Sequence, residues 1–249
     1  VAFVVSKVSE DKRSRESSIW LVPTSGNREA ICFTHGPHDN SPRWSPDGKK
    51  IAFLSNRGKK TQVFLISSEG GEALPLTEVE EGVSSFQWSP DGSRMLLSLR
   101  KEEISEEKIE GEKKEPKPDI QVIKQARYKA NGVHPYLDRK RTHLFVFDIA
   151  SKKISQITKG DAWNDQDPVW SPDGKWIAFC SDRTGEEYEG SSNNDLWILP
   201  ADGGELKQLT TQSHQDTYPQ WSADGKIIAY LRSDKPYAQP EIYVVSSQG

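Results

Sequence analysis

The five residues Trp170-Ser171-Pro172-Asp173-Gly174 decide the fold, because the chain of 249 residues contains four copies of this phrase, one of them with Ala223 in place of the proline. The other copies are Trp44-Ser45-Pro46-Asp47-Gly48, Trp88-Ser89-Pro90-Asp91-Gly92 and Trp221-Ser222-Ala223-Asp224-Gly225. The tryptophans are 44, 82 and 51 residues apart. A period in the range of 40 to 50 residues is typical of β-propellers and other repeat arrays. The spacing of 82 is one such period with an insertion of about 38 residues.

Short apolar runs recur around every copy. One run begins seven residues after each tryptophan, as at 51–54, and a second follows it, as at 63–66. A short alternating run that ends in threonine comes next, as at 74–77, and a fourth run leads into the next tryptophan. These segments are rich in β-branched and aromatic residues and are bounded by Gly, Pro, Asn and Asp, which is typical of strands. The pattern predicts an all-β propeller of four-stranded blades, incomplete in this chain, with four full blades and half of a fifth.

The Ser-Pro-Asp-Gly phrase has the chemistry of a tight turn. We expect it to link the outermost strand of one blade to the innermost strand of the next, with the tryptophan against the neighbouring blade. The expected blades are 1–45, 46–89, 90–171 with an insertion at 101–138, 172–222, and a half blade at 223–249. Because the chain begins on a first strand and stops after a second, we expect open sheet edges that are available for pairing with a second copy of the chain.

Three aspartates lie in register, five residues before their tryptophans: Asp39, Asp165 and Asp216. Three carboxylates at one repeat position suggest a site. Their repetition favours a structural role instead, in which each carboxylate accepts hydrogen bonds from the loop that enters its strand.

Composition excludes several classes of protein. The formal charge of −4 and the pI of about 5.8 argue against a nucleic-acid partner, which requires clustered Lys and Arg. No apolar run approaches the roughly 20 residues of a transmembrane helix, so we expect no membrane partner. The two cysteines, Cys32 and Cys180, are too few for a disulfide framework or a zinc site and are interpreted as core residues. The His35-Gly36-Pro37-His38 stretch is interpreted as a chance pair of loop histidines, so no metal or cofactor is expected.

Searches for catalytic motifs give no candidate residue. The sequence contains no Gly-x-Ser-x-Gly nucleophile elbow, P-loop or dinucleotide-binding fingerprint. The Ser98-Leu99-Arg100-Lys101 stretch matches Ser-x-x-Lys, but a pattern of four common residues arises by chance. We therefore assign no catalytic residue.

The insertion has two parts of different character. Residues 101–118 contain seven Glu and five Lys and are expected to form a solvated loop. Residues 125–143 carry two Tyr, two His and several cations. Long insertions in folds with short loops are often functional, and we take Arg127, Tyr128, Tyr136 and Arg139 as candidates for a substrate gate or a domain seam.

The phrase Trp-Ser-Pro-Asp-Gly-Lys-x-Ile-Ala-Phe-x-Ser-x-Arg, present at 44–57 and 170–183, resembles the propeller repeat shared by TolB and the prolyl oligopeptidase family of serine peptidases. In the insertion, Arg127-Tyr128, Gly132, Tyr136-Leu137-Asp138-Arg139 and the run from Thr142 to Val146 are similar to the corresponding blade of the acylaminoacyl-peptidase-like branch. The chain departs from that branch at Val133-His134-Pro135, where the branch tends to have a second glycine.

The resemblance implies a propeller that precedes an α/β-hydrolase domain with a Ser-Asp-His triad, covers its active site and restricts entry to short or unfolded peptides. None of the triad positions exists in this chain, so the resemblance implies a hydrolase domain outside residues 1–249 and no activity for the chain alone. The expected location is the cytoplasm. The alternatives are a TolB-like propeller that binds proteins in the cell envelope, with a periplasmic location, and a repeat scaffold without a specific partner.

Overall fold

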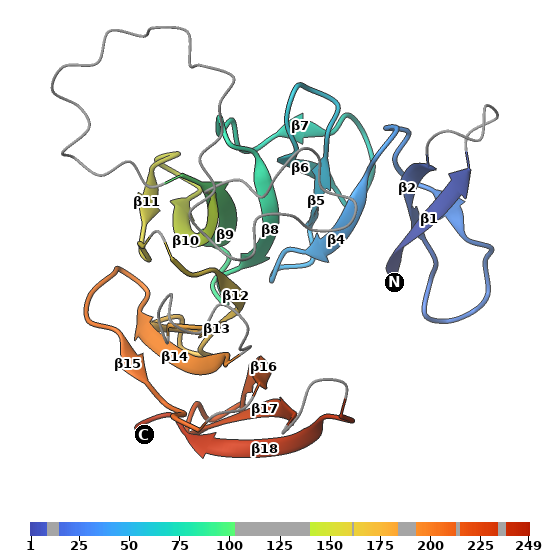
Figure 1. The fold of residues 1–249 in the computed structure, drawn as a ribbon. Helices are drawn as coiled ribbons and strands as arrows, with labels where there is room; N and C mark the ends of the chain where they lie inside the picture. The colour runs from blue at the N-terminus through green and yellow to red at the C-terminus, as the bar shows by residue number, and fades with distance from the viewer. Residues whose placement is uncertain (9–14, 103–139, 161, 184–192, 213–214, 234–237) are drawn as a thin grey trace, which may run out of the picture.

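The computed structural model describes residues 1–8, 15–102, 140–160, 162–183, 193–212, 215–233 and 238–249 (Figure 1). These residues form eighteen strands in five antiparallel sheets, and they contain no helix. The number of strands and the all-β class agree with the pattern of apolar runs. The described part of the chain has no helix with the length and apolar character that crossing a membrane requires.

Within each sheet, strands that follow one another in the chain are hydrogen-bonded neighbours. Sheet 1 contains β1 (Ala2–Val8), β2 (Arg15–Leu21) and β3 (Ile31–Cys32). Sheet 2 contains β4 (Asn40–Trp44), β5 (Lys50–Ser55), β6 (Gln62–Ser67) and β7 (Leu74–Pro75). Sheet 3 contains β8 (Val83–Trp88), β9 (Arg94–Lys101), β10 (Arg141–Asp148) and β11 (Ile154–Gln156).

Sheet 4 contains β12 (Asp165–Trp170), β13 (Trp176–Ser181), β14 (Asp195–Pro200) and β15 (Lys207–Gln208). Sheet 5 contains β16 (Gln215–Trp221), β17 (Ile227–Ser233) and β18 (Glu241–Ser246). The five sheets follow one another along an open arc, from sheet 1 at the right of Figure 1 to sheet 5 at the bottom. This is the arrangement of propeller blades, with three four-stranded sheets between two three-stranded ones.

The expectation that the tryptophan strand closes the preceding blade is wrong. In sheet 2, β4 pairs with β5 across the turn, with Trp44 opposite Ile51, and sheets 3 to 5 repeat this pairing. The physical reason is that a tight turn returns the chain alongside the strand that it has just left, so it makes a hairpin inside one sheet. Each tryptophan therefore ends the first strand of its sheet, and the sheet boundaries fall one strand earlier than expected.

The repeated turn is held by the same hydrogen bonds in all four copies. In sheet 4, Ser171 Oγ donates to Asp173 Oδ1 (2.6 Å), which also accepts the backbone N–H of Lys175 (3.0 Å). Gly174 has a φ of +68°, which a residue with a side chain rarely adopts. In sheet 3, hydrogen bonds from the Ser89 and Ser93 hydroxyls and the Ser93 N–H lower the pKa of Asp91 to about 2. The sequence of the phrase is thus explained by a turn that satisfies its own polar groups.

The apolar core lies in the seams, which are the packed interfaces between consecutive sheets. Each seam is numbered by the two sheets that form it. Alternate residues of a second strand face the two neighbouring sheets. Ile51 and Phe53 pack with Ile19 in seam 1/2, whereas Ala52 and Leu54 pack with the sheet 3 side chains of seam 2/3. Every described sheet therefore contributes apolar residues to a neighbour, and a single sheet has no core of its own.

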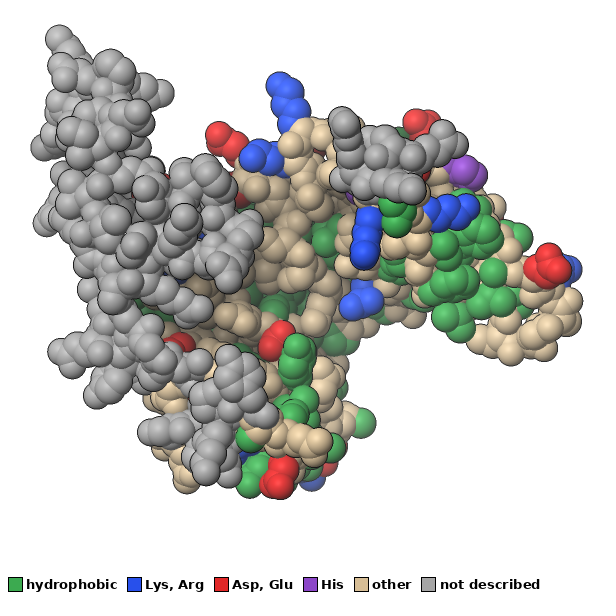
Figure 2. Space-filling view, turned by 45° about the vertical axis from the view of Figure 1, so that its right-hand side comes forward, with side chains coloured by type: hydrophobic (Ala, Val, Ile, Leu, Met, Phe, Trp, Pro, Cys, Tyr) green, Lys and Arg blue, Asp and Glu red, His purple; other side chains and the backbone are tan. Residues whose placement is uncertain are grey.

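Sheet 5, at one end of the arc, exposes a face that corresponds to a seam. On β18, Ile242 is 78% exposed and Val244 is 62% exposed, whereas Leu196 and Ile198 at the matching places of β14 are 0% and 3% exposed. Val1, Val4 and Val8 at the other end are also exposed, although Val4 lies opposite Ile19 of seam 1/2. Figure 2 shows hydrophobic side chains on the right-hand part of the surface.

In sheets 1 to 4, the threonine that follows the last strand fastens that strand to the one before it. The hydroxyls of Thr34, Thr77, Thr158 and Thr210 accept the backbone N–H of Ile19, Val63, Leu144 and Leu196, at 2.9–3.0 Å. All four threonines are buried, so each hydroxyl satisfies a donor that water cannot reach.

We predict that Thr158→Val lowers the free energy of unfolding by about 1–3 kcal/mol, because the isosteric side chain leaves the buried N–H of Leu144 without an acceptor. Thr142→Val, on the same strand β10 at a half-buried position, is the matched control and should change stability by less than about 0.5 kcal/mol. Chemical denaturation of both variants measures the difference. Equal losses would show that the hydrogen bond contributes nothing beyond side-chain replacement.

Candidate functional site

The first strands of sheets 2 to 5 lie next to one another, and a hydrogen bond that involves a side chain links each of them to the next. Trp88 Nε1 of β8 donates to the backbone O of Arg43 in β4 (3.4 Å), and Gln87 Nε2 of β8 donates to the backbone O of Pro168 in β12 (2.6 Å). The N–H of Tyr218 in β16 donates to Asp167 Oδ2 in β12 (3.4 Å). These hydrogen bonds hold the four first strands side by side along the arc.

Three of these strands contain an irregularity at the same repeat position. Ser41, Asp167 and Tyr218 lie three residues before their tryptophans and have φ values of 52°, 48° and 53°. The pairing register of each strand shifts at this point. Bulges of this kind re-aim side chains and are common beside functional sites, and the positive φ costs energy in a residue other than glycine. Apart from the proline that follows each of the three, no sequence pattern indicates these bulges.

Burial sets Asp167 apart from an ordinary surface carboxylate. Desolvation raises its pKa, and the hydrogen bond from the Tyr218 N–H opposes this only in part. Tyr218 itself is 61% exposed, so a strained, exposed aromatic residue lies beside a partly desolvated carboxylate on the first strands.

The three aspartates in register form ion pairs in three of the seams. Asp39 Oδ2 accepts from Arg57 Nη2 at 2.6 Å, Asp165 Oδ1 accepts from Arg183 Nη2 at 2.7 Å, and both oxygens of Asp216 accept from Arg232 at 2.8 and 2.9 Å. All three aspartates are fully buried. Each arginine also lies over aromatic rings of its sheet, at 5.4 Å from Phe64, 5.3 Å from Trp197 and 4.9 Å from Tyr243.

These contacts support the structural role expected for the aspartates, with a change of partner. The loop contact that we expected is present for Asp39, which accepts the N–H of Gly36 at 3.1 Å. The main partner is nevertheless an arginine 16 to 18 residues later in the chain. In seam 3/4, the other oxygen of Asp165 lies 3.3 Å from Nδ1 of the buried His143.

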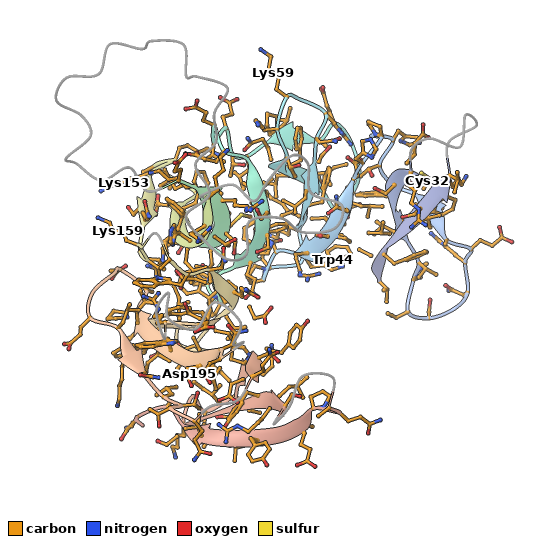
Figure 3. The ribbon with its side chains drawn as sticks, viewed as in Figure 1. Cys32, Trp44, Lys59, Lys153, Lys159 and Asp195 are labelled. Atoms are coloured by element: carbon orange, nitrogen blue, oxygen red, sulfur yellow. The ribbon has the colours of Figure 1, made fainter. Side chains whose placement is uncertain are left out.

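Asp195, at the start of β14 (Figure 3), is buried with neutral partners. Its carboxylate accepts from Gln208 Nε2 at 2.9 Å and from the Thr210 hydroxyl at 3.3 Å. Desolvation, with a contribution from the charges of Asp216 and Asp182, raises the pKa of Asp195 to about 6. The ionised form of Asp195 therefore opposes folding at neutral pH.

The candidate gate residues Arg127, Tyr128, Tyr136 and Arg139 lie outside the described residues, so their placement stays a prediction. Cys180 is confirmed as a core residue, since it is fully buried beside Leu196 and Tyr230, and burial raises the pKa of its thiol. Cys32 is half-buried and donates to the backbone O of Thr34 at 3.3 Å. In the described ranges, no group of three or more His, Cys, Asp and Glu side chains is arranged to hold a metal ion.

We predict that Asp195→Asn stabilises the protein at pH 7.5 and has little effect at pH 4. A carboxyl group whose pKa is raised in the folded state binds more protons folded than unfolded, so its contribution to stability decreases as the pH rises from about 4 to about 6. The upper limit of this loss is about 3 kcal/mol, and we expect a gain of about 1–3 kcal/mol for the variant at pH 7.5. Denaturation of both proteins across this pH range measures it. A difference that does not vary with pH would contradict the assignment.

We predict that Arg232→Met lowers the free energy of unfolding by about 3–5 kcal/mol, because it leaves the buried carboxylate of Asp216 without its cation. Lys226→Met removes the surface pair Lys226–Asp224, in which both side chains are mostly exposed, and should cost less than about 1 kcal/mol. Urea denaturation of both variants compares them. A small loss for Arg232→Met would mean that the ion pair does not stabilise the pairing of β16 with β17.

Comparison with known proteins shows which families and folds this chain resembles. The family described as the dipeptidyl peptidase IV N-terminal region matches residues 129–218. The chain is 36% identical over 205 residues to the uncharacterized peptidase YuxL of Bacillus subtilis, which covers 80% of this chain and 30% of that protein. The structure resembles an acylaminoacyl peptidase of Pyrococcus horikoshii with a TM-score of 0.67 and 22% identity, over 98% of this chain and 35% of that one.

A putative TolB from Agrobacterium tumefaciens also resembles the chain, with a TM-score of 0.64 and 18% identity, over 100% of this chain and 78% of that one. At this level of identity, both structural matches speak for the fold alone. The chain spans about a third of the length of curated peptidase relatives such as YuxL and the dipeptidyl-peptidases 5 of two Porphyromonas species. Residues 1–249 are therefore a propeller part of the kind found N-terminally in peptidases of the prolyl oligopeptidase family.

Proposed function

We propose that this chain is the substrate-gating and domain-packing propeller of an acylaminoacyl-peptidase-like serine peptidase. The observation that carries the proposal is the relationship to peptidases along most of the chain, together with a fold that matches the propeller of an acylaminoacyl peptidase. Catalysis then belongs to an α/β-hydrolase domain of the same protein, and the chain alone is inactive, since its sequence has no nucleophile elbow.

The seams give a physical basis for gating. Four first strands are linked in series by hydrogen bonds, and buried ion pairs join strands inside three seams. Such an array presents a fixed polar surface rather than an adaptable one. A fixed passage lined by these strands admits short or extended peptides and excludes folded proteins by size. The proposed partners are accordingly the hydrolase domain and short peptides, with a second copy at the open sheet edges, and the proposed location is the cytoplasm.

We predict that replacing Arg127, Tyr128, Tyr136 and Arg139 singly by alanine in the full-length protein changes its selectivity among peptides more than its stability. Side chains at an entrance or a domain seam act on access, so kcat/KM for longer peptides should change relative to that for dipeptide substrates. Lys113→Ala and Glu115→Ala, in the charged part of the same insertion, are the controls. Equal losses for all substrates together with a lower Tm would indicate a packing role instead.

The inactivity of the chain alone has its own test. We expect purified residues 1–249 to release no product from chromogenic peptide substrates, while the full-length protein does so and is stopped by a serine-directed reagent. Hydrolysis by residues 1–249 that the reagent abolishes would overturn the proposal.

The second candidate function is a TolB-like protein-binding module in the cell envelope, with a periplasmic location. The TolB resemblance supports it, because it covers all of this chain and most of the TolB chain. Cell fractionation separates the two candidates when it is combined with the peptidase assay. A periplasmic protein without peptidase activity that retains envelope proteins on an affinity column would favour this second function.

A further inference from the structure

Seam 2/3 differs from the other three seams at one repeat position. Val83 occupies the position of the aspartate, five residues before Trp88, and lies opposite Leu99 in the strand pairing. Ser55 and Ser181 occupy the place of Leu99 in sheets 2 and 4. Both Val83 and Leu99 belong to the apolar core of this seam. The ion pair that Asp39, Asp165 and Asp216 make elsewhere is therefore replaced by an apolar contact.

A cavity of about 400 Å³ lies at this place and is open to solvent. Leu54 and Val83 contribute its apolar floor, and the first strands contribute Asn40 and Ser84. Lys60 and Glu81 complete the rim from the segments that precede β6 and β8. The volume falls within the range of small-molecule sites.

The wall on the Glu81 side is fixed by hydrogen bonds. Gly82 N donates to Val79 O (3.2 Å), and Val83 N donates to Thr61 O (2.8 Å). The Gln62 side chain holds both backbone groups of Val79, at 2.7 and 3.1 Å. A Cβ at Gly82 would lie 3.2 Å from Thr61 O, so the two walls approach each other closely here. The backbone of this wall is thus preorganised, which lowers the cost of binding.

Lys60 and Glu81 are exposed charges of opposite sign on one rim, and they do not neutralise each other. No ion pair or hydrogen bond joins either side chain to another group among the described residues. Elsewhere in this chain, adjacent opposite charges such as Asp39 and Arg57 are paired at 2.6 Å. A ligand that carries both a negative and a positive charge can form ion pairs with Lys60 and Glu81 at the same time.

We propose that this cavity binds a small zwitterion of the amino acid or dipeptide class, with its carboxylate at Lys60, its ammonium at Glu81 and an aliphatic side chain over Leu54 and Val83. Asn40 and Ser84 supply hydrogen bonds to the part of the ligand between its charges. The inference rests on the proposed function only for the origin of the ligand, since peptidases consume and release such molecules. Free amino acids and dipeptides share this chemistry, and the experiment separates them.

The test is isothermal titration calorimetry with the full-length protein. The protein is first treated with a serine-directed reagent, so that no turnover of the peptides occurs. The ligands are leucine, Gly-Leu, Gly-Gly-Leu and doubly capped acetyl-Gly-Leu-amide. We expect Gly-Leu or leucine to bind, and the capped peptide to bind at least tenfold more weakly, because it lacks both charges. The better of the two free ligands identifies the source. Binding of the capped peptide with equal affinity, or no binding by any ligand, would overturn the proposal.

Matched variants locate the binding. Lys60→Gln and Glu81→Gln should each weaken binding at least fivefold, since a charged hydrogen bond is lost. Lys59→Gln and Glu80→Gln remove neighbouring charges that do not line the cavity, and they should change affinity less than twofold. Figure 3 shows Lys59 pointing away from the sheets. Equal effects in the two sets would mean a general charge effect and would exclude this site. All four positions are exposed, so the variants should fold.

The binding experiment and the peptidase assay can give opposite results, so the proposed site and the proposed function can be rejected independently. Zwitterion binding by a protein without peptidase activity would reject the proposed function and leave the site standing. Peptidase activity without zwitterion binding would do the reverse.

Discussion

The structure depends on burial of apolar side chains between sheets rather than within them. A sheet of three or four short strands has two faces and cannot cover either by itself. Here each second strand alternates its side chains between the two neighbouring sheets, as Ile51 and Ala52 do. Each sheet is therefore stable only through its neighbours, which is the physical definition of a repeat array. On the third strand of sheet 5, the exposed Ile242 and Val244 correspond to the buried Leu196 and Ile198 of β14, but they have no neighbouring sheet to cover them.

Several buried polar groups of the seams are satisfied by a partner, whereas the ring N–H of Trp170 has none among the described residues. The hydroxyl of Thr158 accepts a hydrogen bond from a buried backbone N–H. The carboxylate of Asp216 accepts two hydrogen bonds from the guanidinium group of Arg232. A buried ion pair need not add stability over an apolar pair, but it makes a wrong register of the two strands that it joins costly. Seam 2/3, where Val83 faces Leu99, shows that the fold also tolerates the apolar alternative. The hollow beside that contact gives this seam room for a ligand.

Most of the fold could be predicted from the sequence, because each repeat states the same strand signals again. The strand that carries the tryptophan was placed in the wrong sheet, since a cyclic pattern does not mark where a unit begins. The arginine partners could have been found in part: Arg57 and Arg183 lie thirteen residues after their tryptophans, but Arg232 lies eleven after Trp221. The positive φ of Tyr218 and the cavity at Val83 depend on strand register and on packing between sheets, which a local pattern does not contain.

The central functional claim is that this propeller serves a catalytic centre that lies elsewhere in the same protein. The most direct measurement is labelling of the full-length protein with a fluorophosphonate probe, followed by digestion and mass spectrometry of the modified peptide. The account predicts one labelled serine, outside residues 1–249. A labelled serine within residues 1–249, or no labelled serine in a correctly folded protein, would contradict it.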